Sequence, residues 1–348
     1  MEDFFANYGL FLAKTITFVA AVLVIIAAGA AASRKVSGGE GLKVENLNER
    51  YRKLAGTLKR SVVNRKAAKA LAKAEKAAAK KAAKKAAKNA GKSDESRPRT
   101  FVVDFKGDIK ATGVAALREE VSAVLAVAGE DDEVLVRLEN AGGMVHEHGL
   151  AASQLVRLRE AGVKFTVAVD RVAASGGYLM ACIADRIVAA PFAILGSIGV
   201  LAQLPNFNRM LDNHGVEFEQ IAAGKYKRTV TMFGKNTEED RDKLRQELED
   251  VHRLFQDAVG RYRPDLDMEK VATGEHWYGT QAIALSLADE LATSDELLVK
   301  AVEDRDVYKV TYEIKQPLPK KVLHSMDALA ERAADILWRR LQESRYLR

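Results

Sequence analysis

Beyond residue 98 the chain alternates short apolar runs with longer amphipathic ones. Runs rich in Val and Phe predict buried strands at 101–105, 134–138 and 165–169. Helical spacing of apolar residues predicts intervening helices at 114–128 and 149–160, with a further short helix after Ser175. Strands that alternate with helices indicate an α/β fold built on a parallel sheet. A further short strand is predicted at 216–222.

Two later segments also show helical patterns. A long charged helix is predicted at 237–262, and Asn236 followed by Glu239 has the pattern of a capping box at its start. The stretch 320–343 is amphipathic, and we expect it to dock on a neighbouring subunit or to lie at the membrane surface.

The N-terminal region is almost entirely apolar over residues 4–32. Its part 15–32 holds 18 uncharged residues, enough to span a bilayer. A cleaved signal peptide is the competing interpretation, but acidic Glu2 and Asp3 stand where such a peptide has basic residues. We therefore expect an uncleaved transmembrane helix. A second apolar run, 187–205, is interrupted by Pro191 and two glycines, and we expect it in the core.

A Lys/Ala-rich tract follows at 65–92. It carries a net charge of +10, so the rest of the chain carries −4 and the basic character belongs to this tract. Nucleic-acid binding by the main domain is therefore not expected. The tract is either a solvated, partly helical spacer or a surface that adheres to anionic lipid.

Two predicted strands end in glycine-containing turns. One strand leads into Asn140-Ala141-Gly142-Gly143, and another leads into Ser175-Gly176-Gly177. Because the carboxyl ends of parallel strands meet at one edge of the sheet, both turns face the same crevice. There a serine is exposed as a nucleophile, and the N–H groups of Gly143 and Gly176 can donate to an oxyanion. The simpler alternative is that Ser175 is only a helix N-cap.

A serine needs a base to take its proton. A lysine serves only when its amine is neutral, which burial favours. Lys225 and Lys227 are candidates, although a basic cluster of this kind is ordinarily a solvated surface patch. The six histidines show no spacing that specifies a triad. With one cysteine and no clustered ligands, we expect neither metal nor cofactor.

Four sequence blocks resemble peptidase family S49, the family of signal peptide peptidase A, and most closely its anchored inner-membrane members. The blocks occur in the family's order over about residues 100–305, at 139–145, 172–178, 190–200 and 273–279. The resemblance implies a Ser/Lys dyad with Ser175 as nucleophile and Lys227 as base, Lys225 being the weaker candidate. It implies that Ser197, otherwise a simple turn residue, orients the lysine, and that Gly143 and Gly176 supply the oxyanion donors.

Two positions depart from the family pattern. Asn140-Ala141 stands where the family has Ser-Pro, which leaves the Gly143 N–H less firmly fixed. Ser286 stands where the family has glycine, at a helix end.

The resemblance implies a ClpP/crotonase-like spiral fold with a parallel sheet, preceded by the transmembrane helix. We divide the chain into a transmembrane anchor (4–32), a basic linker (33–98), a peptidase domain (99–305) and a C-terminal strand with an amphipathic helix (306–348). The implied assembly is a homo-oligomeric ring in which serine and lysine meet near a subunit boundary.

The function predicted from these features is that of a membrane-anchored serine endopeptidase. It would cleave signal-peptide remnants or other membrane-associated peptides through an acyl-enzyme. A crotonase-type enzyme acting on thioesters and an inactive peptidase-like scaffold are the alternatives. The expected location is the bacterial inner membrane, in a single pass. Basic residues after the anchor favour a cytoplasmic catalytic domain, whereas the resemblance implies work outside the cytoplasm.

Overall fold

The structure is a computed structural model that describes residues 41–64, 66–70, 72–74, 77 and 97–314. The apolar segment 4–32 and the amphipathic stretch 320–343 lie outside these residues, as does most of the Lys/Ala tract. Within the described ranges, no helix is long and apolar enough to cross a bilayer.

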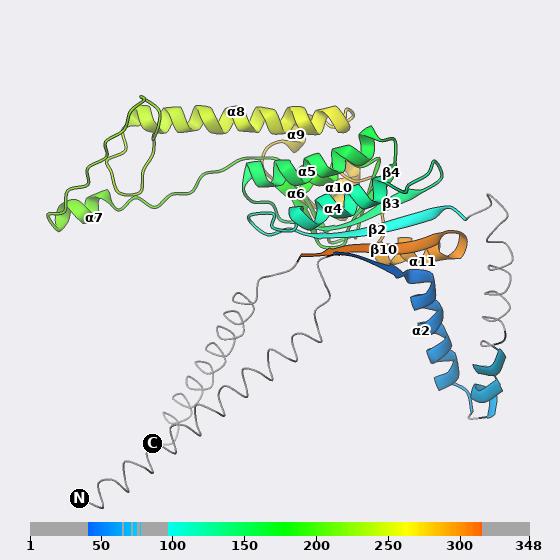
Figure 1. Cartoon of the computed structure of the whole chain (residues 1–348). Coiled ribbons are helices and arrows are strands. Elements are labelled where there is room, and N and C mark those ends of the chain that lie inside the picture. Colours follow the sequence, from blue (N-terminus) through cyan, green and yellow to red (C-terminus); the bar gives the residue numbers. More distant parts are fainter. Residues whose placement is uncertain (1–40, 65, 71, 75–76, 78–96, 315–348) are drawn as a thin grey trace, which may run out of the picture. The chain divides into compact units, whose positions relative to one another are not determined.

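A seven-stranded sheet is the centre of the described part of the chain, with strand order β1-β10-β2-β3-β4-β6-β9. Its strands are β1 (Gly41–Asn46), β2 (Arg99–Lys106), β3 (Glu133–Glu139), β4 (Lys164–Val169), β6 (Arg186–Ala189), β9 (Glu290–Leu291) and β10 (Asp306–Glu313). Every pair from β10 to β9 is parallel. The predicted α/β fold with a mainly parallel sheet is therefore confirmed (Figure 1). The sheet takes its edge strand β1 from the segment that we assigned to the linker.

Helices cover both faces of this sheet because its strands are apolar on both sides. On one face, Phe101, Val103 and Phe105 of β2 belong to the large core. That core also contains residues of three helices, α4 (Val114–Leu125), α5 (Val145–Glu160) and α6 (Gly176–Ala181). On the other face, Val102 packs in a smaller cluster with residues of α2 (Leu47–Ser61) and α11 (Ser294–Asp304). The predicted strands and helices of this region are all present, with bounds shifted by a few residues.

A second sheet of three strands is also present among the described residues. It comprises β5 (Val172–Ala174), β7 (Ile194–Gly196) and β8 (His276–Tyr278). β5 pairs in parallel with β7, and β7 pairs antiparallel with β8. Asn140, at the end of β3, forms a parallel bridge with Ala173. The end of β3 is thereby tied to the strand that precedes Ser175.

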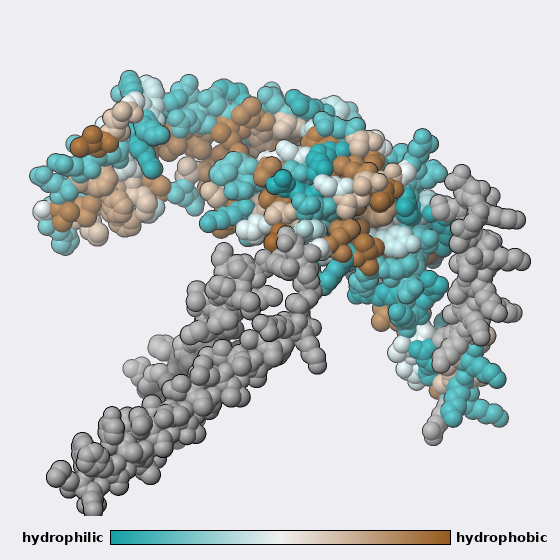
Figure 2. Space-filling model, in the orientation of Figure 1, coloured by the Kyte–Doolittle hydropathy of each residue, from teal (hydrophilic) through white to brown (hydrophobic). Residues whose placement is uncertain are grey.

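Residues 199–237 form an arm that contains α7 (Asn208–Asn213) and leads into the long helix α8 (Glu238–Tyr262). Figure 1 shows the arm beside the N-terminal end of α8, away from the large sheet. The predicted strand 216–222 is wrong, because these residues are exposed loop with no strand partner among the described residues. The arm exposes large hydrophobic side chains, including those of Leu201, Leu204, Met210, Phe218 and Ile221. Figure 2 shows brown patches of hydrophobic residues on the surface of the molecule.

The long helix begins where the sequence predicted, but a different pair of residues caps it. Thr237 Oγ1 accepts a hydrogen bond from the N–H of Asp240, and the Asp240 carboxylate accepts from the N–H of Thr237. Asn236 instead closes the preceding turn with Thr231. The capping box that we expected from Asn236 and Glu239 is therefore corrected by one residue.

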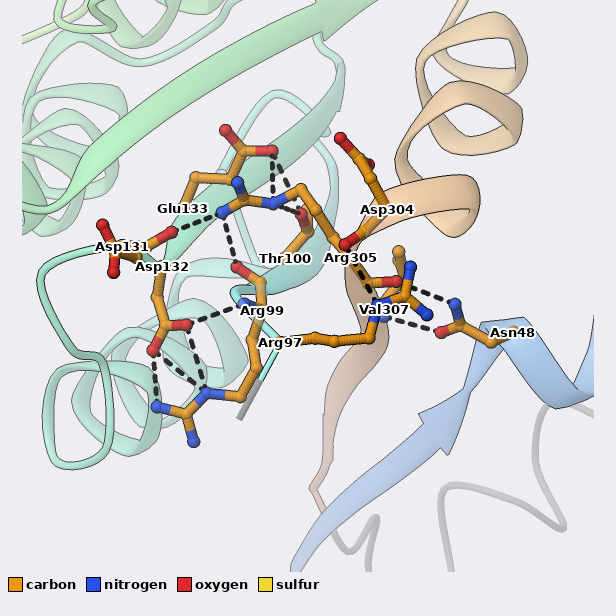
Figure 3. Close-up of polar contacts among 10 residues, drawn as sticks. All are labelled: Asn48, Arg97, Arg99, Thr100, Asp131, Asp132, Glu133, Asp304, Arg305 and Val307. Atoms are coloured by element: carbon orange, nitrogen blue, oxygen red, sulfur yellow. Dashed lines mark hydrogen bonds and ion pairs between the residues drawn. The ribbon is translucent and has the colours of Figure 1, made fainter. Parts of the chain in front are cut away.

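A polar network joins the amino ends of β10, β2 and β3 (Figure 3). The Arg305 guanidinium donates to the carbonyl oxygens of Arg99 and Asp131 at 3.0 and 2.6 Å, and pairs with Glu133 at 3.3 Å. Asn48 of α2 donates to the Arg305 carbonyl and accepts from the N–H of Val307. These contacts connect segments that are far apart in the sequence.

Candidate active site

Ser175 occupies the sharp turn between β5 and α6. Its backbone has φ 53° and ψ −123°, a conformation that residues with a Cβ rarely adopt. Two hydrogen bonds hold it: the Ser175 N–H donates to the carbonyl of Gly196 at 2.8 Å, and the Ser175 carbonyl accepts from the N–H of Leu179 at 3.0 Å. Such strain persists only where the surroundings impose it, and it concentrates at functional sites. The side chain of Ser175 is only partly buried.

The two glycine turns of the sequence lie in contact. A Cβ placed on Gly142 would come within 2.7 Å of the Ser175 Cβ and 2.9 Å of the Gly176 nitrogen. Gly142 also has φ +90°, so both the close contacts and the backbone conformation require glycine at this position. The turn that carries Gly143 therefore lies in contact with Ser175 and Gly176 through Gly142.

Both proposed oxyanion donors have N–H groups that remain available. Within the described residues, neither the Gly143 N–H nor the Gly176 N–H donates a hydrogen bond to the chain. Gly143 is exposed, and a Cβ on it would lie 2.3 Å from the Ile109 carbonyl oxygen. Free N–H groups beside a serine can receive the oxygen of a polarised carbonyl.

Ser197 follows Gly196, the residue that receives the N–H of Ser175. It has φ 51°, and its N–H donates to the Glu275 carbonyl at 2.6 Å, which joins β7 to the segment before β8. Ser197 is partly buried. It therefore lies directly after β7, the strand that pairs with β5, but within the described chain its hydroxyl makes no hydrogen bond to either candidate lysine.

The two candidate bases lie in the arm and not beside Ser175. Lys227 is exposed, and its N–H donates to the Gly224 carbonyl within a local turn. Lys225 forms an ion pair with Glu239 at 2.7 Å. The hydrogen bond to Glu239 raises the pKa of Lys225 well above its usual range. This ion pair favours the protonated form of Lys225, which makes it the weaker of the two candidate bases.

Two buried polar residues at the site were given no role in the sequence analysis. Asn140 is 1% exposed and His148 is 0% exposed. The Asn140 Oδ1 accepts from the Gly142 N–H at 2.9 Å, and the Nε2 of His148 lies 3.2 Å from the same oxygen. Only the departure of Asn140 from the family pattern marked this position in the sequence. Nothing marked His148, because a lone histidine on a helix is common.

The core behind the nucleophile is tightly closed. Tyr178 is fully buried, and its hydroxyl donates to the Leu287 carbonyl at 3.1 Å. Cys182, the residue after α6, is also fully buried, and burial raises the pKa of its thiol to about 12. The apolar run that begins at Ile187 enters this core as far as Ile198, as expected, whereas residues 201–205 are exposed. Ser175 therefore directly precedes a helix, α6, whose buried side is packed into the core.

Comparisons with known proteins identify the family of this chain. The model of the Peptidase family S49 N-terminal region matches residues 3–155, and the model of Peptidase family S49 matches residues 157–345. The chain belongs to peptidase family S49. A protein named "Probable protease SohB" from Haemophilus influenzae is 47% identical over 329 residues, covering 92% of each chain. Another of the same name from Buchnera aphidicola is 48% identical, covering 88% of this chain and 89% of its own.

Among solved structures, a membrane-bound stomatin-specific protease aligns with 64% of this chain and 100% of its own. The TM-score is 0.41 and the identity is 12%. Assignment to the family rests on the sequence relatives, with which this chain shares nearly half of its aligned residues.

Proposed function

We propose that the protein is a serine endopeptidase in which Ser175 attacks the scissile carbonyl and Lys227 is the general base. The observation that supports this most directly is the turn at Ser175. A strained serine, in contact with a second glycine turn and flanked by two free N–H groups, is suited to acyl transfer. The Gly143 and Gly176 N–H groups would receive the oxyanion, and Ser197 would orient the lysine amine.

In this proposal the lysine comes from a neighbouring copy of the chain. Lys227 lies in the exposed arm. Within one chain this arm contacts the N-terminal end of α8, for example through the ion pair between Lys225 and Glu239. The arm also exposes several large apolar side chains, such as Phe218 and Ile221, that association would cover. Docking the arm of one protomer over the Ser175 turn of the next gives a homo-oligomeric ring. It would also bury the lysine, which favours its neutral form.

The proposed substrates are peptides associated with a membrane, signal-peptide remnants among them. The predicted anchor 4–32 and the membership of family S49 support a place in the inner membrane. We also infer that the two sheets form the ClpP/crotonase-like spiral. Thioester chemistry receives no separate support from the site.

Mixing two inactive chains tests the dyad and the shared site together. We expect Ser175→Ala and Lys227→Ala to be inactive on a fluorogenic peptide when each is assembled alone in detergent micelles. Subunit exchange between them should restore part of the activity, because some interfaces then pair an intact serine with an intact lysine. A matched control is Lys235→Ala, which changes another exposed lysine of the same arm and should keep full activity.

Each outcome of the mixing experiment is informative. An active Ser175→Ala chain would refute the nucleophile, and an active Lys227→Ala chain would refute the base. If both variants are inactive and mixing restores nothing, serine and lysine belong to one chain, and the shared site is refuted.

A further inference from the structure

The structure assigns a positioning role to Asn140: its side-chain amide, held by His148, sets the Gly142–Gly143 turn so that the Gly143 N–H points at the oxyanion. This inference rests on the proposed function and identifies residues that determine its geometry. We propose it because Asn140 and His148 are the buried polar pair beside Ser175 and neither has a part in the dyad.

Asn140 joins three parts of the site at once. Its backbone N–H donates to the Val172 carbonyl at 2.8 Å, and its carbonyl accepts from the Ala174 N–H at 3.0 Å, so it fixes β3 to β5. Its Oδ1 accepts from the Gly142 N–H at 2.9 Å. The residue that anchors the strand before Ser175 thus also shapes the turn that carries Gly143.

The orientation of the Asn140 amide follows from its partners. The Gly142 N–H can meet only an acceptor, which places Oδ1 on this side. The amide nitrogen then points to the Met180 sulfur at 3.3 Å, a weak acceptor on α6. A side-chain oxygen that accepts from the N–H two residues ahead forms an Asx turn. This hydrogen bond restricts the backbone conformation, as a proline ring does by fixing φ. Asn140 thereby compensates for the proline that this chain lacks at position 141.

His148 holds Asn140 from the opposite side. Its Nε2 lies 3.2 Å from Asn140 Oδ1, and its Nδ1 lies 3.0 Å from the Met144 carbonyl oxygen. We assign the ring proton to Nε2, which then donates to Asn140 Oδ1. The ring also packs against the backbone of Gly176, where a Cβ would come within 2.5 Å of it. One imidazole therefore contacts the turn that bears Gly143 and supports the residue that bears the second donor.

The distance between the two donors should therefore depend on this pair. If Asn140 is replaced by alanine, the Gly142 N–H loses its acceptor and the turn loses its internal restraint. A displacement of about 1 Å at a catalytic group reduces the rate about 10²-fold. Because the ground-state carbonyl needs these donors less than the oxyanion does, kcat should fall while KM stays nearly constant.

The test uses the full-length protein in detergent micelles. We expect Asn140→Ala to lower kcat about 10²-fold with KM nearly unchanged, and to speed amide exchange in fragments containing Gly142. Asn140→Ser should recover part of kcat, because a hydroxyl makes the same turn more weakly. His148→Phe keeps the ring against Gly176 and should give a smaller loss that is not additive with Asn140→Ala.

Gln154→Ala is the matched control, since it removes another buried polar side chain from the helix that bears His148. It should leave kcat unchanged. Unchanged kcat in Asn140→Ala would overturn the inference. So would unaltered exchange at Gly142, additive effects of the two substitutions, or an equal loss in Gln154→Ala.

A second readout separates this inference from the proposed function. If the wild type and Ser175→Ala hydrolyse peptides equally slowly, the peptidase proposal fails. The rate at which a fluorophosphonate labels Ser175 then tests the positioning role of Asn140, because the phosphonyl oxygen uses the same donors as an acyl oxyanion. Slower labelling of Asn140→Ala than of the wild type supports the positioning role, and equal rates refute it. A wild type that is not labelled at Ser175 refutes both proposals.

Discussion

The amino ends and the carboxyl ends of the strands form two opposite edges of the large sheet, and these two edges differ in how their polar groups are used. At the amino ends of β10, β2 and β3, the guanidinium of Arg305 and the carboxylate of Asp132 are engaged with backbone and side-chain partners (Figure 3). At the carboxyl end of β3 and in the adjoining Ser175 turn, two N–H groups have no partner among the described residues and Ser175 is strained. One edge is arranged for stability, and the other keeps groups available for a reaction.

This difference indicates where stability has been given up for function. A strained backbone destabilises a fold by about 1–3 kcal/mol, and so does a buried donor without a partner, such as the Gly176 N–H in the described part of the chain. They accumulate on one side because parallel strands place their following loops together, whereas the opposite side has no such task. Substitutions at the two edges should therefore have opposite effects on activity and on stability.

The largest effect is expected for Ser175→Gly. Glycine adopts φ 53° without strain, so we expect the free energy of unfolding to rise by about 1 kcal/mol. Peptide hydrolysis should fall by at least about 10⁴-fold, because the nucleophile is gone. Urea denaturation and a fluorogenic peptide assay measure the two effects.

Ser286→Gly is the matched control for Ser175→Gly. Ser286 also has positive φ, at 58°, but it is exposed and follows α10 (Gly279–Ala284). We expect a similar gain in stability with full activity. A loss of stability in Ser175→Gly would contradict the strain argument.

At the amino ends of the strands, Arg305→Met should lower stability and leave activity unchanged. Removing the guanidinium takes a donor from two carbonyl oxygens and leaves Glu133 with Thr100 as its remaining partner, so we expect a loss of about 3 kcal/mol in the free energy of unfolding. Activity per folded molecule should be unchanged. Chemical denaturation and active-site titration check this, and reduced kcat in the folded fraction would contradict the separation of the edges.

A smaller effect is expected for Glu120→Gln. Glu120 lies in α4 and contacts the carboxyl end of β10. The Glu120 carboxylate accepts from the Tyr312 N–H at 2.8 Å, and burial raises its pKa from 4.5 to about 6. Because the folded protein binds this proton more tightly, the wild type loses stability as pH rises from about 4.5 to 6. Glutamine should therefore stabilise by up to about 2 kcal/mol at pH 8 and by almost nothing at pH 4.

Thermal denaturation of Glu120→Gln across this pH range, beside Glu119→Gln at the exposed neighbouring position, measures the difference. A gain that does not depend on pH would show that burial of the charge is not its cause.

The strands and helices of the α/β region were predictable because burial on both faces leaves long apolar runs. β1 was not, since the sequence Gly-Leu-Lys-Val-Glu-Asn is mostly exposed on an edge strand and carries little hydrophobic signal. The strand predicted at 216–222 failed because its apolar residues belong to an exposed arm. Their hydrophobicity indicates a surface to be covered and not a sheet.

The site divides in the same way. The contact between the glycine turns was expected from two strands of one parallel sheet. The structure does bring Gly142 against Ser175, but through β5 of the second sheet, which the bridge at Asn140 ties to the end of β3. The roles of Asn140 and His148 depend on a contact between residues eight positions apart that no periodicity reveals. In our proposal Lys227 reaches Ser175 only through assembly, which a single sequence does not encode locally. Its role as base stays a prediction.

The closed core behind Ser175 has a consequence for where such an enzyme can work. Cys182 is the only cysteine in the sequence, and its thiol is buried and protonated at neutral pH. Oxidants attack exposed thiolates, so neither an oxidising nor a reducing compartment alters this residue in the folded chain. No disulfide within the chain has to form or be kept open. The same catalytic fold is therefore chemically suited to either side of a membrane, and redox conditions place no constraint on its orientation.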